Sequence, residues 1–257
     1  MPEIRLKSIN NFILKNANLQ IRDKEFLVLW GKTGAGKTTL LNVVAGLAEY
    51  KGSVLFDGIA VDELSVRQRK ISYLFQNLNL FPHLNVRENI GYGLWMRGES
   101  KKAIHSRVDE MLDLTDIEHL AGCYPQKLSG GEKQRVALAR AMAPCFKIML
   151  FDEPLNSLDF HTARFIRKEI YRLQKKSGIT VVYVTHCFEE VFALADRIAV
   201  LNNGEIIQVD CPVNIFQENN CRAVSEKGYC DCHSEEKNKS TDLELKHTGV
   251  LCHSKNG

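Results

Sequence analysis

The residues of this chain best suited to chemistry form a glycine-rich run, which reads Gly31, Lys32, Thr33, Gly34, Ala35, Gly36, Lys37 and Thr38. The run follows the apolar segment Phe26–Trp30 and precedes a segment of helical character that starts at Thr39. Strand, glycine loop and helix in this order are typical of a phosphate-binding loop, because the backbone N–H groups of the loop and the helix N-terminus all face an anion. We expect Lys37 to reach the phosphates and Thr38 to ligate Mg²⁺. A glycine-rich turn with a surface lysine is the alternative.

A pair of carboxylates forms the second candidate site. Asp152 and Glu153 directly follow the apolar run Ile148–Phe151, which is predicted to be a buried strand. A parallel sheet binds ligands at the carboxyl ends of its strands, so both acids are expected at that edge. Asp152 would hold Mg²⁺, and Glu153 is placed to act as general base on an attacking water. The alternative is an acid pair that faces solvent.

A second glycine motif stands at Leu128–Arg135, where Ser129, Gly130 and Gly131 precede a predicted helix. Backbone N–H groups, a helix N-terminus and a hydroxyl would together bind another phosphate. A serine N-cap with two flexible neighbours is the simpler explanation. The helix is predicted to begin after Gly131.

Together these motifs resemble those of an ATP-binding cassette (ABC) ATPase, the nucleotide-hydrolysing subunit of an ABC transporter. The resemblance covers roughly residues 4–218. It identifies the first run as Walker A, and it matches five further motifs in the family's order: the Q-loop glutamine Gln76, the signature Leu128–Arg135, Walker B at Ile148–Glu153, the D-loop end at Leu158–Asp159, and the switch histidine His186.

The resemblance implies a site made by two copies of the chain. Two ATP molecules would lie between Walker A of one copy and the signature of the other, so Ser129 and Gly131 would contact the partner's γ-phosphate. The expected nucleotide-binding residues also include Gly31–Thr38, Thr39, Gly130 and Asp159. Glu153, His186 and Gln76 are expected to be catalytic. Thr38, Gln76 and Asp152 are expected to hold Mg²⁺.

A narrower resemblance concerns transport. The segment Phe81–Ile90 is similar to that of binding-protein-dependent importers, in which it lines the groove that takes a helix of a membrane permease; a proline loop before a capped helix is the alternative. The short opening Ile9–Leu14 resembles molybdate and tungstate importers. The alternatives are a polyamine, sulfate or iron importer, an exporter, or a non-transport ABC protein acting on nucleic acid or ribosomes. The expected partners are a second copy, a permease and a solute-binding protein, with no nucleic acid.

Several residues depart from the family pattern. No aromatic residue stands in an obvious position to stack on adenine: Ile9 lies nearest in register, and Phe12 is the only nearby ring. Lys32 replaces a common proline, Asn156 a common serine, and Cys187 a common aspartate. None of these changes removes a catalytic group.

The predicted fold is α/β: a P-loop NTPase of the ABC type with a RecA-like core. An N-terminal antiparallel β subdomain, with strands at residues 4–6 and 12–21, and an inserted helical subdomain at about 77–143 complete an ATPase domain of residues 1–220. Alternating strands and helices predict the core, and the apolar run Ile179–Val184 predicts a fully buried parallel strand. A hairpin over residues 197–209, turning at Asn202–Gly204, is predicted to end it.

Composition is that of a globular protein, with 44% hydrophobic and 25% charged residues. The net charge of +3 does not favour nucleic acid, and no apolar run approaches a bilayer span. We therefore expect a cytoplasmic protein, and the resemblance implies that a permease holds it at the inner face of the membrane. Residues 221–257 differ in composition and are expected to be disordered. Five of their cysteine and histidine residues could alternatively bind Zn²⁺ and make the chain a metal-sensing regulator: Cys230, Cys232, His233, Cys252 and His253.

Overall fold

The structure of the protein is a computed structural model that describes residues 3–216. Its centre is a six-stranded sheet in the order β10-β9-β3-β8-β7-β6. All neighbouring strands pair in parallel except β10, which closes a hairpin with β9. The strands are β3 (Phe26–Trp30), β6 (Ile71–Leu74), β7 (Ile148–Asp152), β8 (Thr180–Val184), β9 (Arg197–Asn202) and β10 (Glu205–Asp210). The predicted buried strands and the final hairpin are confirmed.

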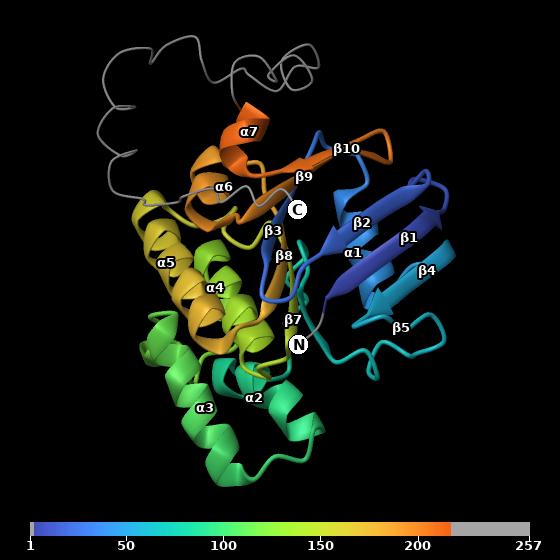
Figure 1. The fold of residues 1–257 in the computed structure, drawn as a ribbon. Coiled ribbons are helices and arrows are strands. Elements are labelled where there is room, and N and C mark those ends of the chain that lie inside the picture. The colour runs from blue at the N-terminus through green and yellow to red at the C-terminus, as the bar shows by residue number, and fades with distance from the viewer. Residues whose placement is uncertain (1–2, 217–257) are drawn as a thin grey trace, which may run out of the picture.

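A second, antiparallel sheet lies on one side of the molecule, in the order β2-β1-β4-β5 (Figure 1). Its strands are β1 (Ile4–Asn10), β2 (Ala17–Ile21), β4 (Lys51–Phe56) and β5 (Ile59–Ala60). The predicted strand over 12–21 is wrong in its first part. The Asn11 side chain accepts hydrogen bonds from the N–H groups of Ile13 and Leu14, which folds 11–16 into a loop before β2 begins.

Helices cover the central sheet on the side away from this second sheet (Figure 1). They are α2 (Val86–Met96), α3 (Lys101–Leu114), α4 (Gly130–Met142), α5 (Phe160–Ser177), α6 (Phe188–Leu194) and α7 (Pro212–Phe216), with the short 3-10 turns η1 (Glu118–Leu120) and η2 (Pro125–Lys127). Helix α2 starts with the predicted capping box of Asn85 and Glu88, and α5 ends at Gly178 in the left-handed conformation.

Two hydrophobic cores lie on the two faces of the central sheet. In β3, Phe26, Val28 and Trp30 pack into the core beneath the helices, whereas Leu27 and Leu29 pack into the core shared with α1 (Lys37–Ala45) and the second sheet. Side chains of a strand alternate between faces, so a strand buried on both must be apolar throughout. The cores fix the carboxyl ends of β3, β7 and β8, which carry the predicted site residues.

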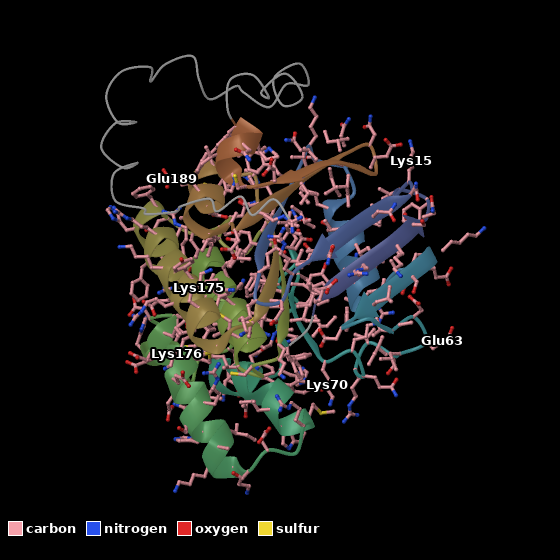
Figure 2. All side chains as sticks on the ribbon, in the orientation of Figure 1. Lys15, Glu63, Lys70, Lys175, Lys176 and Glu189 are labelled. Carbon is pink, nitrogen blue, oxygen red and sulfur yellow. The ribbon has the colours of Figure 1, made fainter. Side chains whose placement is uncertain are left out.

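Exposed charged side chains come from many parts of the chain. Figure 2 shows Lys15, Glu63, Lys175 and Glu189 projecting from different elements. Within residues 3–216 no helix combines the length and the apolar character that a membrane crossing requires.

Candidate functional site

The loop Gly31–Thr38 joins β3 to α1 and has the conformation that its glycines permit. Gly34 and Gly36 have φ values of 80° and 105°, in the region that residues with a side chain rarely adopt. A Cβ atom at Gly31 would lie 2.4 Å from the carbonyl oxygen of Leu201 in β9. No side chain caps the N-terminus of α1, so the free N–H groups of its first turn remain directed at the loop. This arrangement can bind a phosphate.

The ammonium group of Lys37 is folded back into this loop. Its Nζ atom donates hydrogen bonds to the carbonyl oxygens of Gly31, at 2.6 Å, and Lys32, at 2.9 Å. Burial lowers the pKa of Lys37, and the carboxylates of Glu153 and Asp152 oppose that shift. A phosphate entering the loop would give this cation a charged partner in place of two neutral carbonyls.

Asp152 ends β7 and faces the start of α1. Its side chain is buried, which raises its pKa, and a hydrogen bond from Thr38 opposes the shift. A hard divalent cation prefers oxygen ligands, and a buried carboxylate beside a threonine hydroxyl fits Mg²⁺. The amide of Gln76 lies at the same edge, close to Glu153.

Glu153 is the point at which three segments of the chain meet. Its φ of 51° places a non-glycine residue in the left-handed region, and its N–H donates to the carbonyl of Val184 in β8. His186 Nδ1 lies 3.4 Å from Glu153 Oε1, and Gln76 Nε2 lies 3.4 Å from Oε2. The structure therefore brings the three expected catalytic residues together from the ends of β6, β7 and β8.

The signature residues lie elsewhere. Helix α4 begins at Gly130, so the predicted start after Gly131 is wrong by two residues. The cause is a capping box: Ser129 Oγ accepts the N–H of Glu132, and the Glu132 carboxylate accepts the N–H of Ser129. Both hydrogen bonds of this cap are made within the first turn of α4. Asp159 likewise caps α5 by accepting the N–H of Thr162.

Two residues near Glu153 have roles that the sequence did not reveal. Gln134 of α4 is buried, and its Nε2 donates to the carbonyl oxygens of Pro154, at 2.6 Å, and Glu153, at 3.3 Å. Asn156 donates from Nδ2 to Glu153 Oε2 at 2.9 Å. In the sequence, Asn156 stood out only because the family commonly has a serine there. Gln134 lies within the signature Leu128–Arg135, but only the serine and glycines of that motif suggested a function.

Phe12 projects from the loop 11–16, with its side chain 87% exposed. The same loop packs against the phosphate-binding loop, since a Cβ atom at Gly36 would lie 3.0 Å from both Ile13 and Leu14. Ile9 is buried in β1 and therefore cannot offer its surface to a ligand. Of Ile9 and Phe12, only Phe12 is accessible for stacking on adenine.

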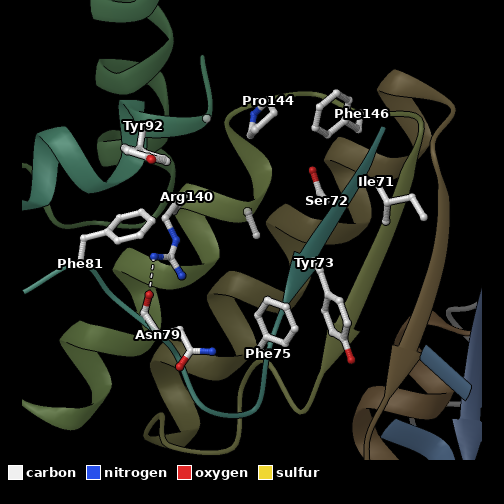
Figure 3. A pocket seen from close by; sticks show the side chains of 12 residues that line it. Ile71, Ser72, Tyr73, Phe75, Asn79, Phe81, Tyr92, Arg140, Pro144 and Phe146 are labelled. Carbon is white, nitrogen blue, oxygen red and sulfur yellow. Dashed lines mark hydrogen bonds between the residues drawn. The ribbon is translucent and has the colours of Figure 1, made fainter. Parts of the chain in front are cut away.

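A cavity of about 330 Å³ lies between β6 and helices α2 and α4. Figure 3 shows Arg140 reaching from α4 toward Asn79, with Phe81 and Tyr92 beside it. Arg140 donates to the carbonyls of Leu78 and Asn79, and its guanidinium lies 5.2 Å from the Phe81 ring centre. The wall of this cavity is thus tied to the segment that follows Gln76.

The described residues hold no cluster of three or more His, Cys, Asp or Glu side chains that could bind a metal ion. The predicted zinc ligands Cys230, Cys232, His233, Cys252 and His253 lie outside the described residues. Cys123, Cys145, Cys187 and Cys211 are free thiols.

Known proteins resemble this chain over most of the described length. The chain is 45% identical over 214 residues to the spermidine/putrescine import ATP-binding protein PotA of Pseudomonas fluorescens (83% of this chain, 59% of PotA). It is 44% identical over 210 residues to the Fe(3+) ions import ATP-binding protein FbpC 1 of Pectobacterium atrosepticum (81% and 60%). The chain thus spans about three fifths of the length of these relatives.

A solved structure agrees in fold. The ATP-binding cassette MJ0796, described as a dimer in a post-hydrolysis state bound to ADP and Pi, superposes with a TM-score of 0.75 at 33% identity, covering 81% of this chain and 98% of that one. The likeness confirms the predicted α/β fold of the ABC ATPase type. The sequence pattern of the family described as "ABC transporter" matches residues 14–156. This chain belongs to the ABC transporter family.

Proposed function

We propose that the chain is the ATP-hydrolysing subunit of an ABC importer. The observation that carries the proposal is the convergence of Glu153, Gln76 and His186 beside a phosphate-binding loop whose lysine and aspartate are buried. Gly31–Thr38 and Thr39 bind the phosphates, and Lys37 balances their charge. Glu153 accepts a proton from the water that attacks the γ-phosphorus, and His186 and Gln76 orient that water. The products are ADP and phosphate.

Mg²⁺ would be held by Thr38, Asp152 and Gln76. When bound, it supplies positive charge to the phosphates. Phe12 would stack on adenine, because it is the exposed ring on the loop beside Gly36.

A second copy would complete the site. Ser129 exchanges hydrogen bonds with Glu132 at the start of its own helix, and Asp159 caps the neighbouring α5. A head-to-tail dimer would bring Ser129, Gly130, Gly131 and Asp159 to the partner's nucleotide. The dimeric structure of the cassette MJ0796 supports the formation of a homodimer. Ser129 Oγ can accept the N–H of Glu132 with a lone pair and still donate its own O–H to an oxygen of the γ-phosphate.

The permease is proposed to dock at the cavity between β6, α2 and α4, whose apolar wall includes Phe81 and Tyr92. This places the subunit at the cytoplasmic face of the membrane, with a solute-binding protein on the other side. Among cargoes, a polyamine or ferric iron has the support of the relatives' names; molybdate or tungstate rests on the opening Ile9–Leu14 alone and stays a prediction.

The test compares the purified chain with its Glu153→Gln and Lys37→Met variants. We expect Mg²⁺-dependent release of phosphate by the unchanged chain, nucleotide binding with only a slow residual turnover in Glu153→Gln, and loss of nucleotide binding in Lys37→Met. Glu153→Gln should also form a dimer with ATP, measured by light scattering, and retain a multi-span permease when drawn from detergent-solubilised membranes. Recovery of ribosomes or nucleic acid instead would contradict the transport part. Full turnover by Glu153→Gln would contradict the role of Glu153.

A further inference from the structure

We infer that Asn156 is a positioning residue for the carboxylate of Glu153. The inference rests on the proposed function, in which Glu153 accepts the proton of the attacking water. Three side chains approach that carboxylate, and the amide of Asn156 is the closest: Nδ2 lies 2.9 Å from Oε2, whereas Gln76 and His186 both lie at 3.4 Å. At 3.4 Å a hydrogen bond is weak, so Asn156 holds the carboxylate most firmly in this state.

The Asn156 contact is local, which distinguishes it from the other two. Asn156 stands three residues after Glu153 in one turn, and its own N–H donates to the Glu153 carbonyl at 3.4 Å. Gln134 fixes this turn from inside by donating to the Pro154 carbonyl. Gln76 and His186 belong to the segments after β6 and β8 and approach Glu153 only through the tertiary fold. The bond from Asn156 therefore survives movement of either segment.

The geometry defines what the amide does. The left-handed backbone of Glu153 sets the direction of its side chain, and Asn156 holds the far end, so few rotamers remain. A neutral donor occupies one lone pair of Oε2 and leaves the charge of the carboxylate intact. Oε1, which faces His186, is left to meet a water. Restricting the base in this way favours the reactive orientation and leaves the phosphate-binding loop untouched, so the gain is in kcat.

Position 156 is also one at which this sequence departs from the family pattern. The family resemblance predicts a serine at 156, whose hydroxyl sits on Cβ and reaches less far than the Asn amide. The longer side chain is what spans the distance to Glu153 here.

Two substitutions of similar volume separate the possible causes. Asn156→Leu keeps the shape and removes the donor, and Asn156→Asp replaces the donor by a second carboxylate. We expect both to lower kcat for ATP by about tenfold, equivalent to about 1.4 kcal/mol of activation free energy. The KM for ATP and the thermal midpoint should stay unchanged, because no group that binds nucleotide is altered. A loss in Asn156→Asp alone would mean that only charge repulsion acts and would overturn the inference.

A double-mutant cycle tests whether Asn156 acts through Glu153. In the Glu153→Gln background, Asn156→Leu should add no further loss to the residual rate. An equal loss in both backgrounds, an unchanged kcat in Asn156→Leu, or a raised KM with unchanged kcat would each overturn the inference. If the unchanged chain releases no phosphate, or Glu153→Gln turns over normally, the proposed function itself fails. If those two behave as expected and Asn156→Leu is fully active, only the present inference fails.

Discussion

Gln134 offers a sharp test of how the signature helix supports the site. Its amide is 4% exposed and donates to the carbonyls of Pro154, at 2.6 Å, and Glu153, at 3.3 Å. Gln134→Leu has nearly the same volume and cannot donate. The buried Pro154 carbonyl would lose this donor, at a cost of about 1–3 kcal/mol in the free energy of unfolding. The turn that carries Glu153 would also loosen, so kcat should fall as well.

The measurement is urea unfolding followed by circular dichroism, with phosphate release assayed in parallel. Gln126→Leu is the matched control, because Gln126 also donates from Nε2 to a proline carbonyl, that of Pro82, but is exposed. The control should change the unfolding free energy by less than about 0.5 kcal/mol. If Gln134→Leu lowers the free energy of unfolding no more than Gln126→Leu does, burial does not strengthen the contribution of this hydrogen bond, and the reasoning is refuted.

Two further predictions concern the nucleotide base and the core. Phe12→Ala should weaken ATP binding about tenfold by calorimetry, since stacking on a base contributes about 1–3 kcal/mol, while Phe165→Ala, another exposed ring, should not. Arg197 donates to the buried carboxylate of Glu25 at 3.1 Å, and Arg197→Met should cost about 3 kcal/mol at pH 7. Burial raises the pKa of Glu25, against the opposing effects of Arg22 and Arg197, so the folded state takes up a proton more readily than the unfolded state. Stability of the variant should therefore increase as the pH falls from neutral toward the ordinary glutamate value, and a flat profile in urea titrations would contradict this sign.

Much of the fold followed from periodicity and from local capping chemistry. The runs Phe26–Trp30 and Ile179–Val184 predicted strands because almost every residue is apolar or β-branched, and Asn85 with Glu88 predicted the start of α2. The failures were local as well. Side-chain hydrogen bonds from Asn11 turned an alternating stretch into a loop, and the capping box at Ser129 drew both glycines into α4. Neither competition can be resolved from alternation alone.

Site residues that belong to a recognised motif could be predicted from the sequence. Contacts between residues far apart in the sequence were harder to predict. Gln76 and His186 are 77 and 33 residues from Glu153 in sequence, yet their motifs indicated a common site. The sheet brings a nitrogen atom of each side chain to 3.4 Å from the Glu153 carboxylate. The hydrogen bond from Gln134 to the Pro154 carbonyl depends on how α4 is rotated about its axis relative to the loop after β7. The pattern of apolar and polar residues in the sequence does not specify that rotation.

The left-handed backbone at Glu153 carries a consequence for engineering. A residue with a Cβ atom in that conformation stores on the order of 1 kcal/mol or more of strain, which glycine would release and asparagine would reduce. Selection of variants for heat resistance alone would thus favour replacing the carboxylate to which we assign the proton transfer. If Glu153 has the proposed role, a more heat-resistant form of the chain that keeps its activity should be obtained by changing other positions, because stability and activity oppose each other at this residue.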